Sequence, residues 1–154
     1  MTDMEGAPPP APAYLGSGPS GPRASFGRRL VAVVLDDILL GIVYAIFFAL
    51  LGRGGAYGVG LLVSLAYYTF FEGSSSGQTV GKRVFDIRVI DFSSGGSIGY
   101  GRALVRWVGR ILSGIVCLLG YLWMLWDKEK QTWHDKIANT VVVPVEYYPV
   151  TSWP

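Results

Sequence analysis

Two adjacent acidic residues, Asp36 and Asp37, lie inside an apolar segment of this sequence, where a carboxylate is costly. The segment 30–51 (LVAVVLDDILLGIVYAIFFALL) contains 22 residues, which as a helix would span about 33 Å, enough to cross a bilayer. A carboxylate at the centre of such a helix costs about 2.5–3.5 kcal/mol, and less toward the end, where these two stand. We therefore expect the pair to have a structural or functional purpose.

Arginines at the start of the same segment could neutralise Asp36. Arg28 and Arg29 directly precede the segment, and basic residues at this position also hold the N-terminus in the cytoplasm. Arg29 lies seven residues before Asp36, so the two would share one helical face about 10 Å apart along the axis. A side chain from another segment is the natural bridge between them.

A second group of arginines follows later in the chain. Arg102, Arg106 and Arg110 are spaced four residues apart, which places them in one stripe on a helix. They could attract anionic lipid headgroups, contributing about 1 kcal/mol each, or Arg106 or Arg110 could pair with Asp36 inside a helical bundle. We favour the ion pair, with an ion-handling Asp36 as the alternative. Asp37 is expected to face a headgroup or the adjacent helix.

The loop after the second apolar segment contains GQTVGKR (77–83), a pattern close to that of a phosphate-binding loop. A Walker A loop needs four residues between its two glycines and a Ser or Thr after its lysine. Here three residues separate Gly77 from Gly81, and Arg83 follows Lys82. We therefore expect a tight turn whose basic residues contact lipid headgroups.

The single histidine, His134, precedes Asp135 in the segment DKEKQTWHDK (127–136). One histidine beside one carboxylate offers too few ligands for a metal site, and no serine or cysteine is placed to act with it as a nucleophile. His134 could titrate near neutral pH and sense it, but we favour a structural role in which His134 and Asp135 bind backbone groups at a turn. The residues therefore predict no metal, no cofactor and no enzymatic activity.

The composition of the chain indicates an integral membrane protein. Of its 154 residues, 51% are hydrophobic and only 16% are charged, whereas an ordinary globular domain has about a quarter charged residues. The single cysteine, Cys117, excludes an internal disulfide framework. The formal net charge is only +2 and the basic residues flank the apolar segments, so we expect no nucleic acid as a partner.

Three apolar segments define the expected fold, an all-α membrane protein with a small helical bundle and a short two-stranded cytoplasmic β element. They cover residues 30–51, 56–71 and 107–126. The turn Gly52–Gly55 between the first two is so short that they must form an antiparallel hairpin, which returns the chain to the cytoplasm. Small residues four apart in the second segment would allow close helix approach.

The third segment, 107–126, conflicts with the positive-inside rule, because basic residues stand on both sides of it. Two interpretations are open: an ordinary span that exports the C-terminus, or a segment that breaks near Gly114 or Gly120 and re-enters. We favour the second, with a cytoplasmic C-terminus, because the two predicted strands could then pair on one side of the membrane.

The predicted strands and tails lie outside the apolar segments. Residues 83–91 (RVFDIRVID) alternate apolar side chains on one face, which is typical of a strand. Residues 140–145 (TVVVPV) form the second strand, with Pro144 requiring an edge or a terminus. Residues 1–22, rich in proline, glycine and alanine, are expected to be a disordered tail. Residues 146–154 are expected to be a C-terminal tail.

Three ordered motifs resemble the RDD family of bacterial membrane proteins, which is named for one arginine and two aspartates. They are RRLVA (28–32) followed by Asp36, then GQTVGKRVFDIRVID (77–91), then DKEKQTWHDKIANTVVV (127–143). The likeness covers nearly everything from Ser25 to Val143, so we expect one RDD-like transmembrane domain over residues 25–145.

The resemblance implies roles for particular residues. The family's arginine corresponds to Arg28 or Arg29, and its first aspartate corresponds to Asp36. Its second aspartate corresponds to Asp135, with Asp127 as the weaker match. The position after the first aspartate is usually uncharged in the family but is acidic here. The other family-motif residues of this sequence are Gly77, Gln78, Thr79, Gly81, Lys82, His134 and Thr140.

The resemblance leaves two hypotheses on function, because transport is proposed for the family and cation/proton antiport for some members. In the first, the chain is a small transport component of the plasma membrane in which Asp36 binds a cation or proton. Three short spans cannot enclose a polar path, so this hypothesis needs a homo-oligomer. In the second, the chain is a non-enzymatic accessory or scaffold protein whose buried charges fix helix register and whose cytoplasmic strands dock a protein partner. We favour the first only because of the family's association with transport.

Overall fold

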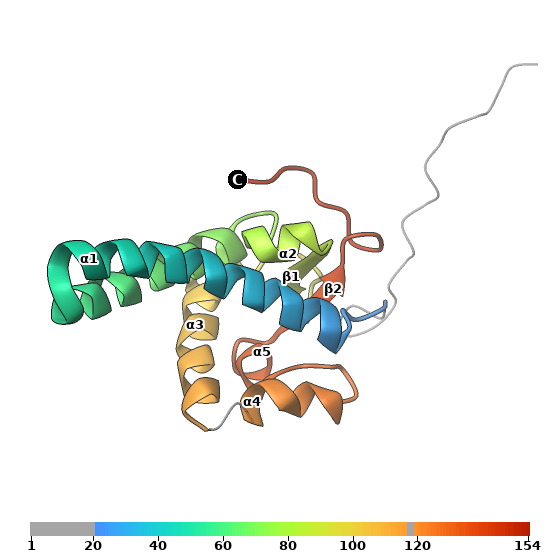
Figure 1. Ribbon diagram of the computed structural model, residues 1–154. Coiled ribbons are helices and arrows are strands. Elements are labelled where there is room, and N and C mark those ends of the chain that lie inside the picture. The colour runs from blue at the N-terminus through green and yellow to red at the C-terminus, as the bar shows by residue number, and fades with distance from the viewer. Residues whose placement is uncertain (1–20, 117–118) are drawn as a thin grey trace, which may run out of the picture.

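The computed structural model describes residues 21–116 and 119–154. Its elements follow in the order α1 (Phe26–Gly73), α2 (Val80–Val84), β1 (Ile87–Asp91), α3 (Gly99–Ile115), α4 (Leu119–Leu122), the 3-10 turn η1 (Trp123–Leu125), α5 (Trp133–Ile137) and β2 (Thr140–Pro144). The chain is therefore mostly helical with one small sheet, as expected (Figure 1). All but the last two residues of the predicted tail 1–22 lie outside the described residues, as does Cys117.

Helix α1 is a hairpin of two arms rather than a straight rod. Gly52 has φ +68° and ψ −176°, a conformation that glycine adopts without steric cost, and the helix reverses direction there (Figure 1). The first arm covers 26–51 and the second 53–73. Across them, the rings of Tyr44 and Tyr57 lie 5.7 Å apart between centroids. The antiparallel hairpin predicted from the glycine-rich turn is thus confirmed, with its second arm beginning before residue 56.

The outer surface of the α1 hairpin is apolar. Leu50 is 71% exposed and Leu62 is 64% exposed, whereas a soluble monomer rarely presents large contiguous apolar patches to water. Among the described residues, α1 is one helical element that is long and apolar enough to cross a membrane, and α3 with the Leu119–Leu125 segment passes the same test only as a bent pair. This finding supports the membrane assignment, while the crossing of the bilayer by three separate segments stays a prediction.

The third apolar segment does not form one helix over 107–126. Helix α3 begins earlier, at Gly99, and ends at Ile115. Its axis makes an angle of 112° with the axis of the following helical segment, Leu119–Leu125, which consists of α4 and η1. A Cβ added at Gly120 would lie 2.5 Å from the Ser113 hydroxyl oxygen, so this glycine lets α4 fold back closely on α3. The predicted bend is confirmed and the straight span is wrong; re-entry into the membrane stays a prediction.

Helix α3 turns its polar face inward and its apolar face outward. The buried positions follow a helical repeat and are Ala103, Arg106, Gly109, Arg110 and Ser113. The outward positions, such as Leu112 and Ile115, are exposed. This distribution is the reverse of that in a soluble amphipathic helix, and it brings two arginines into the interior.

The two strands form one antiparallel pair, with register from Ile87↔Pro144 to Asp91↔Thr140. The prediction of a strand over all of 83–91 is wrong at its start, because Val80–Val84 forms helix α2, capped by the Thr79 hydroxyl. The pairing and the position of Pro144 at the end of β2 are as predicted.

One hydrophobic cluster joins the sheet to the hairpin and to α3. Ile87 and Val89 are fully buried together with Ala32 and Ala103, and Phe85 packs against them. The apolar face predicted for the first strand is therefore the face that packs on the helices, and it fixes the sheet at one end of the hairpin.

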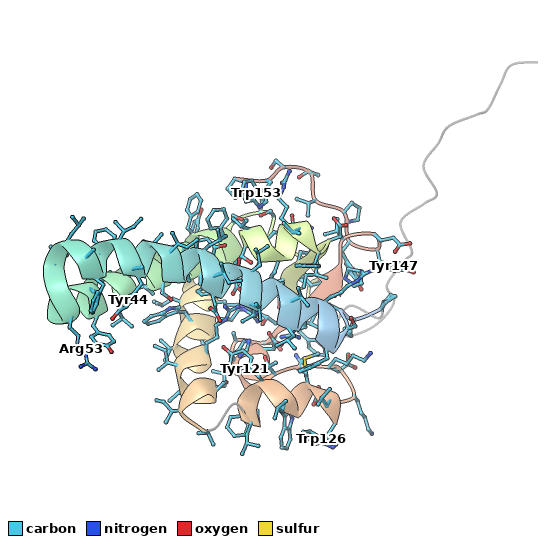
Figure 2. The ribbon with its side chains drawn as sticks, in the orientation of Figure 1. Tyr44, Arg53, Tyr121, Trp126, Tyr147 and Trp153 are labelled. Atoms are coloured by element: carbon cyan, nitrogen blue, oxygen red, sulfur yellow. The ribbon has the colours of Figure 1, made fainter. Side chains whose placement is uncertain are left out.

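The C-terminal segment 146–154 packs onto the fold. Trp153 lies over the α2 end of the molecule (Figure 2). Its ring stacks on the Phe71 ring at 5.3 Å between centroids, and its indole N–H donates a 3.2 Å hydrogen bond to the Gln78 carbonyl. Tyr148 is buried in a second cluster on the outer face of the sheet. The predicted C-terminal tail is thus a docked segment.

Candidate functional site

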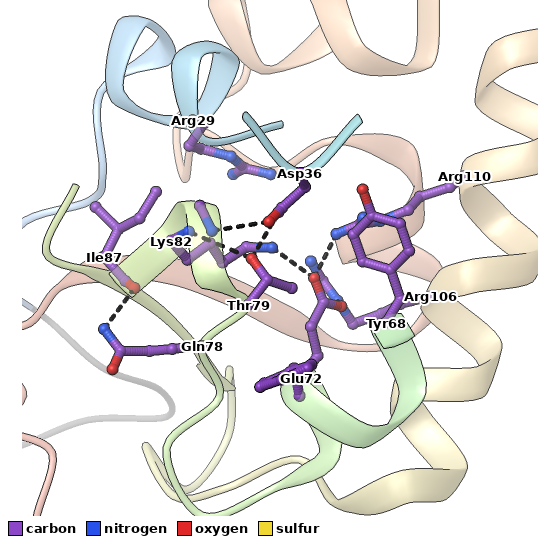
Figure 3. Close-up of polar contacts among 12 residues, drawn as sticks. Arg29, Asp36, Tyr68, Glu72, Gln78, Thr79, Lys82, Ile87, Arg106 and Arg110 are labelled. Atoms are coloured by element: carbon purple, nitrogen blue, oxygen red, sulfur yellow. Dashed lines mark hydrogen bonds and ion pairs between the residues drawn. The ribbon is translucent and has the colours of Figure 1, made fainter. Parts of the chain in front are cut away.

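A network of buried charged side chains lies where the hairpin, α3 and the motif loops meet (Figure 3). The members of this buried ion network are Arg29, Glu72, Lys82, Arg106, Arg110 and Asp135. None of the six is more than 9% exposed. They come from both arms of α1 and from α2, α3 and α5, so the network ties together segments that are far apart in the sequence.

Glu72, at the end of the second arm, is surrounded by three cations. It accepts a 2.6 Å hydrogen bond from the Lys82 ammonium and a 2.8 Å bond from Nε of Arg106, and it also pairs with Arg110. A buried carboxylate is tolerated when charge and hydrogen bonds compensate its desolvation. Burial lowers the pKa of Lys82, although the Glu72 carboxylate opposes this effect.

Asp135 forms the other acidic centre of the network. It accepts a 2.5 Å hydrogen bond from Arg29 and pairs with Arg106, which thus bridges the two buried carboxylates. It also caps α5, because its carboxylate accepts a 3.0 Å bond from the backbone N–H of Thr132. Burial alone would raise the pKa of Asp135, but Arg29 and Arg106 hold it well below its usual range.

Asp36 is fully buried beside this network and is held by uncharged donors. It accepts hydrogen bonds from the Tyr67 hydroxyl at 2.6 Å, the Thr79 hydroxyl at 2.6 Å and the Gly81 backbone N–H at 2.8 Å. The approach of Gly81 is close, since a Cβ there would lie 2.1 Å from the carbonyl oxygen of Ala32. Asp36 therefore fastens the 77–83 turn to the first arm.

The predicted pairing of Asp36 with Arg106 or Arg110 is wrong. Both arginines bind Glu72 of the second arm instead (Figure 3). Glu72 directly follows the predicted second segment, 56–71, and was not among the expected site residues. Its position at the end of an apolar segment, opposite a stripe of arginines, is the signal that could have identified it.

The remaining N-terminal candidates lie at the edge of the network. Arg28 is exposed, so Arg29 is the arginine that enters the site. Asp37 is also exposed, and it accepts a 3.4 Å contact from the Tyr68 hydroxyl of the second arm. The expectation that Asp37 faces the adjacent helix is confirmed.

The 77–83 turn packs between the buried ion network and strand β1. Gly77 has φ +63° and lies against β1, where a Cβ would meet the Val89 carbonyl oxygen at 2.2 Å. The Gln78 side chain donates a 3.1 Å bond to the Ile87 carbonyl. Lys82 was expected at lipid headgroups but is buried against Glu72, so that prediction is wrong.

Asp127 shapes the loop that leads to α5 but lies outside the network. Its carboxylate accepts backbone N–H bonds from Glu129 at 3.2 Å and Gln131 at 3.0 Å, and it pairs with Lys136. Partial burial would raise the pKa of Asp127, but these donors hold it below its usual value. Thr140, the last motif residue, is buried and accepts a hydrogen bond from Arg106.

His134 is buried against α3 and shares a 3.0 Å hydrogen bond with the Thr132 hydroxyl. Burial holds the pKa of His134 well below its usual value, so the ring is neutral at pH 7. Its Nδ1 has no hydrogen-bond partner within the described part of the chain. The described residues contain no group of three His, Cys, Asp or Glu side chains suited to a metal ion.

A cavity of about 340 Å³ lies next to the buried ion network, between the first arm of α1, α3 and the α4–η1 segment. We call it the central cavity. Its charged lining consists of Arg29, Asp37, Lys82, Arg106 and Arg110. Most of the remaining wall is apolar, including Leu30, Val33 and Met124.

The comparisons with known proteins agree with the motif positions. A model of the RDD family matches residues 23–139. The chain is 36% identical over 87 residues to a proline-rich antigen homolog of Mycobacterium tuberculosis strain H37Rv, a match that covers 56% of this chain and 36% of that protein. It is 34% identical to the proline-rich antigen of Mycobacterium leprae, a match that covers 54% of this chain and 35% of that protein.

A further relative is the uncharacterized protein YxaI of Bacillus subtilis, which is 31% identical over 83 residues, 54% of each chain. The chain spans about a third of the length of the mycobacterial relatives that it matches. No solved structure matches the chain.

Proposed function

The chain belongs to the RDD family, and on this premise we propose that it is a non-enzymatic membrane domain that holds a docking platform at the cytoplasmic surface. In this proposal the two arms of α1 cross the bilayer, and the sheet with its motif loops forms the platform. Arms of this length, 26 and 21 residues, correspond to about 39 Å and 31 Å, enough for a bilayer core. Both termini are then cytoplasmic.

The internal pairing of the three buried carboxylates of the described residues, Asp36, Glu72 and Asp135, carries this proposal. Asp36 accepts three hydrogen bonds from its own chain, and Glu72 and Asp135 are each shared among cations of the network. A carboxylate that carries ions must exchange its partners with water or substrate, whereas these contacts fix one arrangement. The network therefore acts as a clamp between the hairpin and the platform.

Two measurements test the proposal. Purified protein in proteoliposomes should release no more Na⁺, K⁺ or H⁺ than protein-free liposomes. A photo-crosslinking residue at Ser93, exposed on the turn after β1, should capture a defined partner in native membranes. The matched control at Leu50, at the tip of the hairpin, should not. Capture of only a second copy of this chain, or protein-dependent cation flux, would overturn the docking function.

Asp37 supports a second candidate, cation transport by an oligomer. Its side chain lines both the central cavity and a second cavity of about 280 Å³ between the two arms, beside Tyr44 and Ser64. An exposed carboxylate that borders two cavities in an apolar hairpin is suited to an ion path. This observation moves the transport hypothesis from Asp36 to Asp37.

Flux measurements on two variants would identify this second function. If the protein transports cations, Asp37→Asn should abolish flux while leaving the thermal stability unchanged. Asp36→Asn should lower the stability, because it weakens the contacts to Thr79 and Gly81, but folded Asp36→Asn protein should retain flux. Flux in Asp37→Asn equal to that of the wild type would contradict the role of Asp37.

A further inference from the structure

We propose that the central cavity binds an anionic amphiphile, with a phosphate group at its arginines and an acyl chain along its apolar wall. The inference goes beyond the proposed function, since neither docking nor transport requires a ligand in this cavity. It is based on three features of the cavity: the sign of the charges that face it, the unpaired donors in its wall, and the apolar surface opposite them.

The charges that face the cavity are mostly positive. Arg29, Lys82, Arg106 and Arg110 line it, and Asp37 is the one acidic residue among its lining residues. The carboxylates that neutralise these cations, Glu72 and Asp135, are absent from the lining. The ion pairs are therefore oriented with their cations toward the cavity, and their field attracts an anion.

Two arginines in the wall keep donors without partners. Arg106 is completely buried and Arg110 is 8% exposed, yet one terminal nitrogen of Arg106 and Nε of Arg110 have no hydrogen-bond partner within the described residues. A buried donor left unpaired is costly and rare in native structures. Phosphate oxygens are strong acceptors for guanidinium donors. Because neither nitrogen has accessible surface, a phosphate in the cavity would pair with both only once the two guanidinium groups turn toward it.

His134 adds a third donor to the same wall. Its Nε2 accepts from, or donates to, the Thr132 hydroxyl. The Thr132 oxygen already receives N–H contacts from Asp135 and Arg29, so the hydroxyl proton is free to point at Nε2. The neutral ring then carries its proton on Nδ1, which has no partner in the described part of the chain and is available to an acceptor.

The opposite wall fits a hydrocarbon chain. It is formed by Leu30, Val33, Val34, Leu122 and Met124. Leu30 is 49% exposed and Val34 is 47% exposed, so the wall continues onto the apolar surface of the hairpin. A small hydrophilic anion would leave this wall in contact with water, whereas a lipid from the bilayer covers it.

The test is a binding measurement on the full chain in a neutral detergent, followed by native mass spectrometry. Phosphatidylglycerol should remain bound at one molecule per chain, and phosphatidylcholine, whose headgroup has no net charge, should not. Inorganic phosphate and glycerol 3-phosphate serve as probes of the headgroup alone. If either competes as well as phosphatidylglycerol, the site binds a free phosphate and the amphiphile assignment is overturned.

A cavity-filling variant avoids damage to the buried ion network. Gly114 lines the cavity, and a Cβ added there meets nothing within 4 Å, so Gly114→Leu should fold and occupy the space of the acyl chain. We expect it to weaken phosphatidylglycerol binding by at least about tenfold, or about 1.4 kcal/mol. The matched control, Gly101→Leu on the exposed surface of the same helix, should bind like the wild type. Equal binding by both variants would overturn the proposal.

Discussion

Replacement of Glu72 by glutamine should destabilise the protein more than any other single charge-neutralising change. The substitution keeps the shape of the side chain but leaves Lys82, Arg106 and Arg110 buried without their shared carboxylate. Breaking one buried ion pair by removal of a partner costs about 3–5 kcal/mol. Lys82 and Arg110 lose their carboxylate partner, and Arg106 keeps only Asp135, so we expect a destabilisation in the upper part of that range.

The assay is thermal unfolding of the purified protein in detergent, followed by tryptophan fluorescence. For a domain of this size, about 4 kcal/mol corresponds to a decrease in Tm of roughly 10 °C or more. The matched control is Glu129→Gln, because Glu129 is 45% exposed and forms a surface pair with Arg23. Such pairs contribute about 0–1 kcal/mol, so this variant should unfold close to the wild type.

A double variant separates the charge effect from other damage. Lys82→Met removes one of the three cations, so Glu72→Gln combined with Lys82→Met should be more stable than Glu72→Gln alone, by about 1–2 kcal/mol within the usual range of coupling energies. If Glu72→Gln lowers Tm no more than Glu129→Gln does, Glu72 is not the centre of a buried network and the argument is refuted.

Three further predictions concern the packing, the acid sensitivity and the arginine geometry of the site. Gly81→Ala should lower the free energy of unfolding by about 1–3 kcal/mol, because the added Cβ would lie 2.1 Å from a carbonyl oxygen of the first arm. The control Gly58→Ala, whose added Cβ has nothing within 4 Å, should be neutral or slightly stabilising. Equal Tm values for the two variants would contradict the close approach at Gly81. Stability should fall as the pH decreases below about 6.5, because the unfolded chain protonates His134 there and the folded chain does not, by at most about 1.4 kcal/mol per pH unit. The depressed pKa of Asp135 adds a further loss of stability below about pH 4. His134→Gln should flatten the dependence of Tm on pH between pH 6.5 and 5, but it should leave the decrease of Tm below about pH 4 unchanged. Arg29→Lys keeps the charge but loses the two-pronged guanidinium contact to Asp135 and a backbone carbonyl. Chemical denaturation should therefore show a free energy of unfolding lower by about 1–2 kcal/mol. An unchanged denaturation midpoint would mean that only the charge of Arg29 matters.

The hairpin, the bend and the strand pairing could be predicted from the sequence because each has a local signal. Gly52 ends the first arm in a conformation that suits glycine, and two glycines flank the bend between α3 and α4. Apolar residues at period two, including Ile87 and Val89, mark the first strand, and its pairing with the second strand was expected, although the register was not. The prediction that the first strand begins at residue 83 was wrong, because the helix cap supplied by the Thr79 side chain favours a helical turn there despite the alternating apolar pattern.

The partners inside the site could not be predicted, because they depend on which segments meet. Asp36, Arg106 and Arg110 were correctly expected to be buried, whereas Arg102 stays partly exposed and pairs with Asp91. Charge alone does not determine which acid an arginine meets. The donors that hold Asp36 are a tyrosine, a threonine and a backbone N–H, and none of them carries a charge that marks it in a sequence. Glu72 was missed for the same reason, since its burial results from the packing of α3 against the second arm.

The position of Glu72 at the end of α1 affects how the chain is assembled on the ribosome. Two of the three arginines of helix α3, Arg106 and Arg110, are buried, and each would cost about 2.5–3.5 kcal/mol at the centre of a lone membrane helix. Glu72 precedes them in the chain and is already in place when they emerge, but Asp135 follows Arg106 by 29 residues, or about 2–6 s of translation. During that interval the hairpin already presents Glu72 to α3, whereas the second carboxylate that binds Arg106 has not yet been made. A newly made chain without Glu72 would therefore lose the docking site for α3 before its fold is complete.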